Sequence, residues 1–305
     1  MDNVIVTGAT GPLGLALCEY LDRLNISVFA IVRPNSARKK YLPSRVRVFE
    51  RDLDNLLSLN VKADAFFHLG WSTETRETVA DPIPQAKNIF QTINAVRLAQ
   101  YSKCKVFVGA GSWVEHGYVT RPITPDTMES PQSAYGIAKY AAGKLSRTLC
   151  QRYGIRHCWA RILSIYGPYD KDTTAFVYFI NCLLKGEKPL LTEGSQTWDF
   201  IYSADCAKAM YLIAEKGKDG AIYPVGTGYA PPIREYFEYI RDRISPCMPL
   251  VFGERPYAKN QVMLLCADIT ELYKDTGFEP DYSFEEGIEK MIEWREHDFN
   301  NNASV

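Results

Sequence analysis

Short apolar runs alternate with amphipathic stretches through the first half of the chain. The apolar runs have the length of buried strands and lie at residues 4–6, 26–32, 46–49, 65–69, 105–108 and 156–163. Residues 15–24, 84–100 and 134–153 lie between them and are expected to form helices. Strands that alternate with helices at this rhythm predict an α/β fold of the Rossmann type, in which helices cover both faces of a doubly wound parallel sheet.

The pattern changes after residue 167, where segments become shorter and turns more frequent. We expect residues 1–167 to form a dinucleotide-binding Rossmann domain that also takes back residues 203–228. Residues 168–305 are expected to form a smaller α+β region that binds the substrate. The chain has neither an internal repeat nor a low-complexity linker, which predicts one compact body.

The composition is that of an ordinary globular protein, with 46% hydrophobic and 23% charged residues and a formal net charge of -1. This charge gives no reason to expect nucleic acid or a membrane surface as a partner. The eight cysteines form no C-x-x-C pair, the four histidines have no ligand spacing, and a strand pattern begins at once. We therefore expect a cytoplasmic, metal-free protein with reduced cysteines.

A loop that contains Gly8, Gly11 and Gly14 joins the first predicted strand to the first predicted helix. Glycines allow a tight turn and close approach of the backbone, and the N-terminus of a helix offers N–H groups to a pyrophosphate. The spacing differs from the Gly-x-Gly-x-x-Gly form, and a plain turn is the alternative interpretation. The position between strand and helix favours dinucleotide binding.

Arg33 follows the second predicted strand, about 20 residues after the glycine loop, where dinucleotide folds select between cofactors. An acidic residue there would accept a hydrogen bond from the ribose 2′-hydroxyl, whereas an arginine suits a 2′-phosphate. Arg38, Lys39 and Lys40 lie nearby and could assist. A solvated basic loop is the alternative interpretation. We expect NADP as the cofactor and NAD as the second choice.

Several candidate residues fall at the carboxyl ends of predicted strands, where such folds bind ligands. They are Gly8, Arg33, Asp52, Leu69 and Ser112. Their convergence on one edge of the sheet is stronger support for a binding site than any single motif. The neighbouring His68 is expected to be a structural hydrogen-bonding residue.

Tyr135 and Lys139 lie four residues apart in the long predicted helix and therefore share one face. An ammonium beside a phenol favours the phenolate, so we expect Lys139 to lower the pKa of Tyr135. Two other tyrosine–lysine pairs have the same spacing, so this pair alone is weak support. The glycine loop, and Ser112 in an upstream turn of small residues, indicate an enzyme that moves a hydride while protonating an oxygen.

These motifs together resemble the extended short-chain dehydrogenases/reductases, and more narrowly the NAD(P)-dependent epimerase/dehydratase family that acts on nucleotide sugars. The resemblance runs from residue 4 to about residue 290. It is carried by Thr7-Gly8-x-x-Gly11-x-x-Gly14, Ser112, Tyr135-x-x-x-Lys139 and Trp198-Asp199-Phe200-Ile201-Tyr202-x-x-Asp205. It implies that Tyr135 is the acid/base, that Lys139 lowers its pKa and holds the nicotinamide ribose, and that Ser112 orients the substrate oxygen.

The resemblance also implies which residues contact each ligand. The dinucleotide is expected at Gly8, Thr10, Gly11, Pro12, Leu13, Gly14, Arg33, Asp52, Leu53, Leu69, Gly70, Trp71, Tyr135, Lys139 and Ile162. The sugar nucleotide is expected at Trp113, His116, Ser164, Gln196, Trp198 and Arg255. Arg255 would hold the diphosphate as a bidentate donor, and a surface arginine is the alternative. His116 would shuttle a proton, and an exposed loop histidine is the alternative.

One departure from the family argues against a 4,6-dehydratase. Such enzymes carry an Asp-Glu pair just after the position of Ser112, where this chain has Trp113 and Val114, which cannot transfer a proton. The leading hypothesis is an NAD(P)-dependent reductase of a nucleotide-linked 4-keto sugar. A C4 epimerase, which usually retains NAD, is the runner-up. A reductase of a non-nucleotide ketone or aldehyde also fits, and a non-catalytic dinucleotide-sensing protein is less favoured.

Two of the predicted helices bear on the oligomeric state. Residues 84–100 and 134–153 resemble the helices that pair between subunits in this family. We therefore expect a homodimer formed through a four-helix contact, with a monomer as the alternative.

Overall fold

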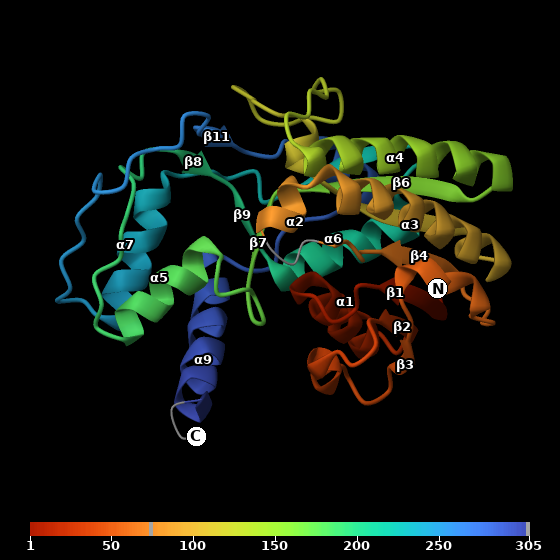
Figure 1. The fold of residues 1–305 in the computed structure, drawn as a ribbon, viewed down its shortest axis with the longest axis horizontal. Coiled ribbons are helices and arrows are strands. Elements are labelled where there is room, and N and C mark those ends of the chain that lie inside the picture. Colours follow the sequence, from red (N-terminus) through yellow and green to blue (C-terminus); the bar gives the residue numbers. More distant parts are fainter. Residues whose placement is uncertain (73–75, 303–305) are drawn as a thin grey trace.

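The central element of the protein is a seven-stranded parallel sheet (Figure 1), in a computed structural model that describes residues 1–72 and 76–302. Its spatial order is β10-β6-β5-β4-β1-β2-β3. The chain therefore starts inside the sheet, adds β2 and β3 on one side of β1, and then adds β4 and the later strands on the other side. The predicted Rossmann-type fold is confirmed. The strands are β1 Asn3–Thr7, β2 Ser27–Val32, β3 Arg47–Glu50, β4 Ala65–His68, β5 Val106–Ser112, β6 Arg156–Ile162 and β10 Ile222–Val225.

Helices cover both faces of this sheet because both faces of its strands are apolar. In β1, Val4 and Val6 pack on the side of α1 (Pro12–Arg23) and α6 (Ser203–Lys216), whereas Ile5 packs on the other side. That other side is covered by α3 (Pro82–Tyr101) and α4 (Ala134–Tyr153). Burial on both faces is typical of parallel sheets. The remaining elements beside the sheet are α2 Arg76–Ala80, α8 Thr270–Thr276 and the short 3-10 helices η1 Ala37–Tyr41, η2 Leu53–Ser58 and η3 Trp113–Glu115.

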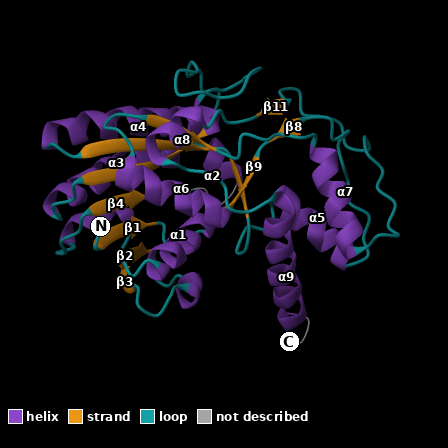
Figure 2. Ribbon diagram, turned by 180° about the vertical axis from the view of Figure 1, so that it is seen from behind, coloured by secondary structure: helices purple, strands orange, loops and turns teal. Residues whose placement is uncertain are grey.

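A smaller lobe lies to one side of the sheet (Figures 1 and 2) and is built around aromatic side chains. Its helices are α5 Ala175–Leu184, α7 Ile233–Ile244 and α9 Phe284–Asn302. Two short parallel pairs connect it to the sheet, β7 Ser164–Tyr166 with β9 Phe200–Tyr202 and β8 Thr197–Trp198 with β11 Leu264–Leu265. The predicted domain boundary at residue 167 stays a prediction, although α6 and β10 do lie with the sheet.

The buried carboxylate of Asp199 ties the smaller lobe to the loop after β10. It accepts hydrogen bonds from the Thr227 backbone N–H (2.8 Å) and hydroxyl (2.7 Å), and from the N–H groups of Gly228 (3.0 Å) and Ala267 (3.1 Å). Four donors satisfy a buried charge that would otherwise be costly. The aspartate of the Trp198–Tyr202 motif is therefore structural.

The small residues before Ser112 form the end of β5 and are not the turn that the sequence suggested. A Cβ on Gly109 would lie 2.1 Å from the ring of Trp159, and one on Gly111 would lie 2.3 Å from its Nε1. These glycines are needed because the indole of the neighbouring strand β6 lies across them.

Among the described residues, no helix is long and apolar enough to cross a membrane.

Candidate active site

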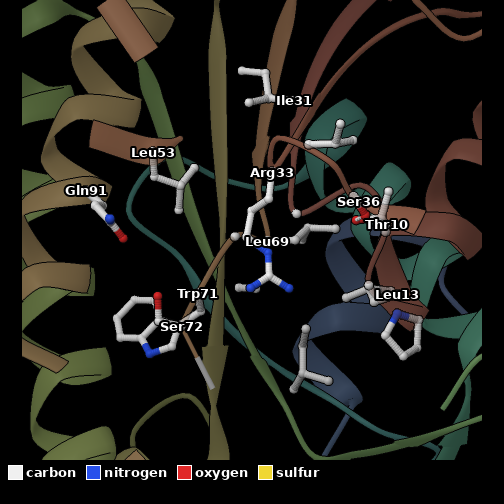
Figure 3. A pocket seen from close by; sticks show the side chains of 18 of the residues that line it. Thr10, Leu13, Ile31, Arg33, Ser36, Leu53, Leu69, Trp71, Ser72 and Gln91 are labelled. Atoms are coloured by element: carbon white, nitrogen blue, oxygen red, sulfur yellow. Dashed lines mark hydrogen bonds between the residues drawn. The ribbon is translucent and has the colours of Figure 1, made fainter. Parts of the chain in front are cut away.

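A cavity of about 1020 Å³ runs along the carboxyl ends of the sheet strands. Figure 3 shows part of its lining, which comes from the glycine loop, the ends of β2, β4 and β5, and helices α3 and α4. All fifteen residues at which the sequence predicted dinucleotide contact line this cavity, and so does Ser112. The structure thus brings together residues that are up to 154 positions apart, whose individual roles stay predictions.

The glycine loop packs so closely against neighbouring backbone that side chains at Gly8 and Gly14 would not fit. Gly8 has a φ of +68°, and a Cβ there would lie 2.7 Å from the backbone nitrogen of Gly70. A Cβ on Gly14 would lie 2.2 Å from the carbonyl oxygen of Gly8. Gly11 precedes α1, and no side chain caps this helix, whose N-terminus opens onto the cavity. An uncapped helix N-terminus in a glycine loop suits a diphosphate.

One end of the cavity is rich in arginine. Arg33, Arg38 and Arg51 line it, and Figure 3 shows the guanidinium of Arg33 reaching into the cavity. The other proposed helpers lie elsewhere, since Lys39 pairs with Glu50 at 2.5 Å and Lys40 lies over a tyrosine ring of η1. The three arginines outnumber the carboxyl groups of Asp52 and Asp170, which also line the cavity, and this excess of positive charge suits an additional phosphate.

Ser112, Tyr135 and Lys139 lie together at the other end of the cavity, where β5 ends beside the first turns of α4. Helix α4 begins here because the Ser133 side chain accepts a hydrogen bond from Gly136 N–H at 3.1 Å. The Lys139 Nζ donates to the Ala110 carbonyl at 2.8 Å and lies 5.8 Å from the centroid of the Tyr135 ring. The three side chains therefore face one space.

The pKa values of this trio differ from the sequence-based expectation. Burial raises the pKa of Tyr135 to about 12, although a hydrogen bond from Ser112 acts in the opposite direction. Burial also lowers the pKa of Lys139 to about 7, while nearby Glu115 opposes this change. The expected lowering of the Tyr135 pKa is wrong, because the removal of water raises this pKa more than the Ser112 hydrogen bond lowers it. At neutral pH Tyr135 keeps its proton and can donate it.

A buried ion pair supports the position of Ser112 from behind. Arg161 Nε donates to Glu115 Oε2 at 2.9 Å, and both side chains are only 1% exposed. Glu115 also accepts from the Ser112 backbone N–H (2.8 Å) and from Trp159 Nε1 (3.0 Å). Glu115 is thus fully engaged in structure, although it lies close to the position of the dehydratase acid/base pair.

His116 does not line the cavity, and neither the predicted sugar contact nor an exposed loop position describes it. Its side chain is 1% exposed, with Nε2 at 3.2 Å from an Arg161 nitrogen and Nδ1 at 3.2 Å from the Met128 carbonyl oxygen. Burial and the neighbouring guanidinium lower its pKa, which disfavours the charged form. The sequence did not indicate that Arg161 would occupy this space. By contrast, the structural role predicted for His68 is confirmed, since Thr7 and Thr92 bond its two ring nitrogens.

Three of the predicted sugar-binding residues form a cluster just beyond Ser112. The rings of Trp113 and Trp198 meet edge to face at 5.8 Å, and Trp198 Nε1 donates to Ser164 Oγ at 2.7 Å. Gln196 is buried and accepts from the Tyr257 hydroxyl. The side chain of Arg255 is exposed in the loop at residues 251–262. None of these residues lines the cavity described above, so their contacts with a substrate stay predictions.

The cavity also has lining residues that sequence reasoning did not find. Lys87 and Gln91 come from α3 and both contact Asp54, at 2.6 and 3.0 Å, while Asp170 and Lys171 come from the loop after β7. Lys87 and Gln91 could have been found from the sequence, because α3 carries several amide and hydroxyl side chains, most of which are buried. Buried polar residues on a helix indicate a hydrogen-bonded groove.

Comparison with known proteins gives matches over most of the chain. The profile of the NAD dependent epimerase/dehydratase family matches residues 4–226. A putative UDP-glucose 4-epimerase of Methanocaldococcus jannaschii is 26% identical, with 99% of this chain and 100% of that protein aligned.

Two solved structures share the fold. The Thermotoga maritima UDP-glucose 4-epimerase with UDP-glucose has a TM-score of 0.88 at 22% identity, covering 97% of this chain and 99% of the other. The Thermus thermophilus UDP-glucose 4-epimerase complex with NAD has a TM-score of 0.84 at 20% identity, covering 96% and 99%.

Proposed function

Since the chain belongs to the NAD dependent epimerase/dehydratase family of extended short-chain dehydrogenases/reductases, we propose that it reduces a nucleotide-linked 4-keto sugar with NADPH. The observation that carries this proposal is the arginine-lined end of the cavity, opposite the end that holds Ser112, Tyr135 and Lys139. The arginine end suits a 2′-phosphate, and the other end suits proton transfer to an oxygen.

The cofactor part of the proposal rests on the charge balance around Arg33. Arg33, Arg38 and Arg51 line the cavity together with Ser36, whose hydroxyl bonds Thr10 at 3.3 Å. Arg33 stands where an acidic residue would accept a bond from a ribose 2′-hydroxyl. A planar guanidinium instead matches a phosphate with two parallel hydrogen bonds. NADP is therefore favoured over NAD, which the Thermus thermophilus structure contains.

The glycine loop and Arg33 would hold the cofactor, which when bound would provide the hydride for the carbonyl carbon of the substrate. The electron pair of the C=O bond then moves to the oxygen, which takes the proton of the Tyr135 hydroxyl. Ser112 donates a hydrogen bond to the same oxygen, so the developing charge meets two prearranged donors. Solvent returns a proton to Tyr135 after each turnover, and Lys139 favours the transient phenolate while it is charged.

A C4 epimerase is the second candidate, because the relative and the solved structures described above carry epimerase names. The same trio could remove and return the hydride and proton. Such an enzyme regenerates its cofactor in each cycle and has no need to exchange it. A 4,6-dehydratase is disfavoured, since Trp113 and Val114 cannot transfer protons and Glu115 is engaged with Arg161.

The substrate part of the proposal rests on the cluster of Trp113, Trp198 and Ser164. Trp113 follows Ser112 directly, so this cluster adjoins the reacting end of the cavity. Aromatic faces and a hydroxyl are typical of sites that bind a sugar and a base. Arg255, exposed on the loop at 251–262, is the residue that we propose to bind the diphosphate.

A homodimer through α3 and α4 is also part of the proposal. The two helices pack side by side, and their outer surfaces expose apolar side chains. The exposed fractions are 79% for Ile83, 58% for Phe90, 61% for Tyr101 and 53% for Ile137. A Phe90→Glu variant should elute as a monomer if this face forms the dimer, and an unchanged mass would exclude the interface.

The first experiment is to denature the purified protein and identify any released dinucleotide by mass. An empty protein whose melting temperature rises more with NADPH than with NADH would support the reductase. Stoichiometric NAD that survives purification would favour the epimerase. Tyr135→Phe should then bind NADPH normally but lose turnover about 100-fold or more, because the proton donor is gone. Unchanged turnover would remove the proposed mechanism.

A further inference from the structure

A tryptophan ring covers the ammonium of Lys139. Trp71 lies just past the end of β4, and the Lys139 Nζ is 3.7 Å from the centroid of its ring. The same ring meets that of Tyr135 at right angles, with centroids 6.1 Å apart. One indole therefore contacts both of the ionisable side chains that the proposed chemistry uses.

The position of this indole is fixed from the side of α3. Trp71 Nε1 donates to Gln85 Oε1 at 2.9 Å. Gln85 is itself only 1% exposed, and its Nε2 donates to the carbonyl oxygens of Thr78 (2.8 Å) and Ser72 (3.2 Å). A buried amide with several partners has one favourable orientation, so the ring it holds cannot turn away without breaking a hydrogen bond.

We propose that Trp71 is a positioning residue that favours the charged form of Lys139 and holds its ammonium beside Tyr135. A cation over the face of an indole is attracted by the negative potential of the ring, and the attraction is stronger where water is excluded. Only 4% of Lys139 is exposed, so water contributes little to its solvation. The indole replaces part of this lost solvation without competing as a hydrogen-bond acceptor, which leaves the N–H groups free for the Ala110 carbonyl and a ribose.

The other groups around the ammonium come from four elements. Glu115 of η3 attracts the charge, and the Ala110 carbonyl of β5 accepts a hydrogen bond from it. Tyr135 of α4 is neutral, and His68 of β4 is also neutral because burial lowers its pKa to about 3. Among the described residues, Glu115 and the rings of Trp71 and Tyr135 favour the charged form of Lys139, and the Trp71 ring is the nearer of the two, at 3.7 Å against 5.8 Å.

The test measures the protonation of Lys139 directly, by NMR of protein that carries 13Cε-labelled lysine. The Lys139 signal is assigned by its loss in Lys139→Met. Tryptophan is then replaced biosynthetically by 5-fluoro- and 5,7-difluorotryptophan, which weaken the negative potential of the ring while nearly keeping its shape. We expect the titration midpoint of Lys139 to move to lower pH with each added fluorine atom. The acid dissociation constant of Lys139 should rise threefold to tenfold overall.

The matched control is Trp71→Phe, in which the other four tryptophans carry the same fluorine atoms. Fluorination should leave the Lys139 midpoint of this variant unchanged. An equal change in variant and wild type, or no change in the wild type, would overturn the proposal.

The catalytic consequence of this inference rests on the proposed function, but the titration does not. If the protein reduces a 4-keto sugar nucleotide, the limb of its kcat–pH profile that follows Lys139 should move with the NMR midpoint. If it reduces none, the proposed function fails, and the titration still decides whether Trp71 sets the charge of Lys139. A profile that stays fixed while the midpoint moves would remove the link to catalysis.

Discussion

Removal of the Glu115 carboxylate should destabilise the protein strongly, because this group is the centre of a buried network. Glu115→Ala leaves the Arg161 guanidinium without its buried partner, and leaves the Trp159 and Ser112 N–H groups without their acceptor. Loss of one partner of a buried pair typically costs about 3–5 kcal/mol. Arg161 keeps a second bond, to Glu129 at 2.6 Å, so we expect the free energy of unfolding to fall by about 3 kcal/mol.

The assay is urea denaturation followed by tryptophan fluorescence and by circular dichroism. The matched control is Glu254→Ala, which breaks a partly exposed pair with Lys188 and should cost less than about 1 kcal/mol. Replacement of the whole pair, in Glu115→Leu with Arg161→Met, should cost less than Glu115→Ala, because no charge is left buried alone. A loss for Glu115→Ala no larger than that of the control would refute the reasoning.

Three other predictions concern separate parts of the molecule. Arg33→Asp should raise the KM for NADPH relative to the KM for NADH. An unchanged ratio of these two values would count against a 2′-phosphate contact. Gly14→Ala should abolish the thermal stabilisation by dinucleotide, because its Cβ would lie 2.2 Å from the Gly8 oxygen; a normal shift would contradict this reading of the loop. Burial lowers the pKa of His157 to about 4, so below pH 6.5 only the unfolded chain takes up this proton. This histidine alone should therefore lower the stability by about 1.4 kcal/mol per pH unit down to about pH 4. His157→Gln should make that decline shallower in urea titrations at several pH values, and equal slopes would exclude this contribution.

Local patterns in the sequence were enough to predict the fold and the edge of the sheet where the cavity lies. The fold follows from local properties of the sequence, namely strand length, helical period and the positions of Gly8 and Gly14. The location of the cavity follows from the rule that parallel sheets bind ligands at the carboxyl ends of their strands. The residues at which the family resemblance implied dinucleotide contact all line one cavity. The sequence predicted that these residues share one edge of the sheet, and the structure supplied the order of the strands.

Burial and contacts between distant segments could be known only from the tertiary structure. The spacing of Tyr135 and Lys139 predicted proximity but gave the wrong direction for the tyrosine pKa, because the spacing says nothing about how much water is removed. The sequence alone suggested a loop position for His116. In the structure Arg161, 45 positions away, lies beside it. Trp71 covers Lys139 only when α4 packs on the sheet and brings the two residues together, since the energy of such a contact depends on distance in space and on local exclusion of water.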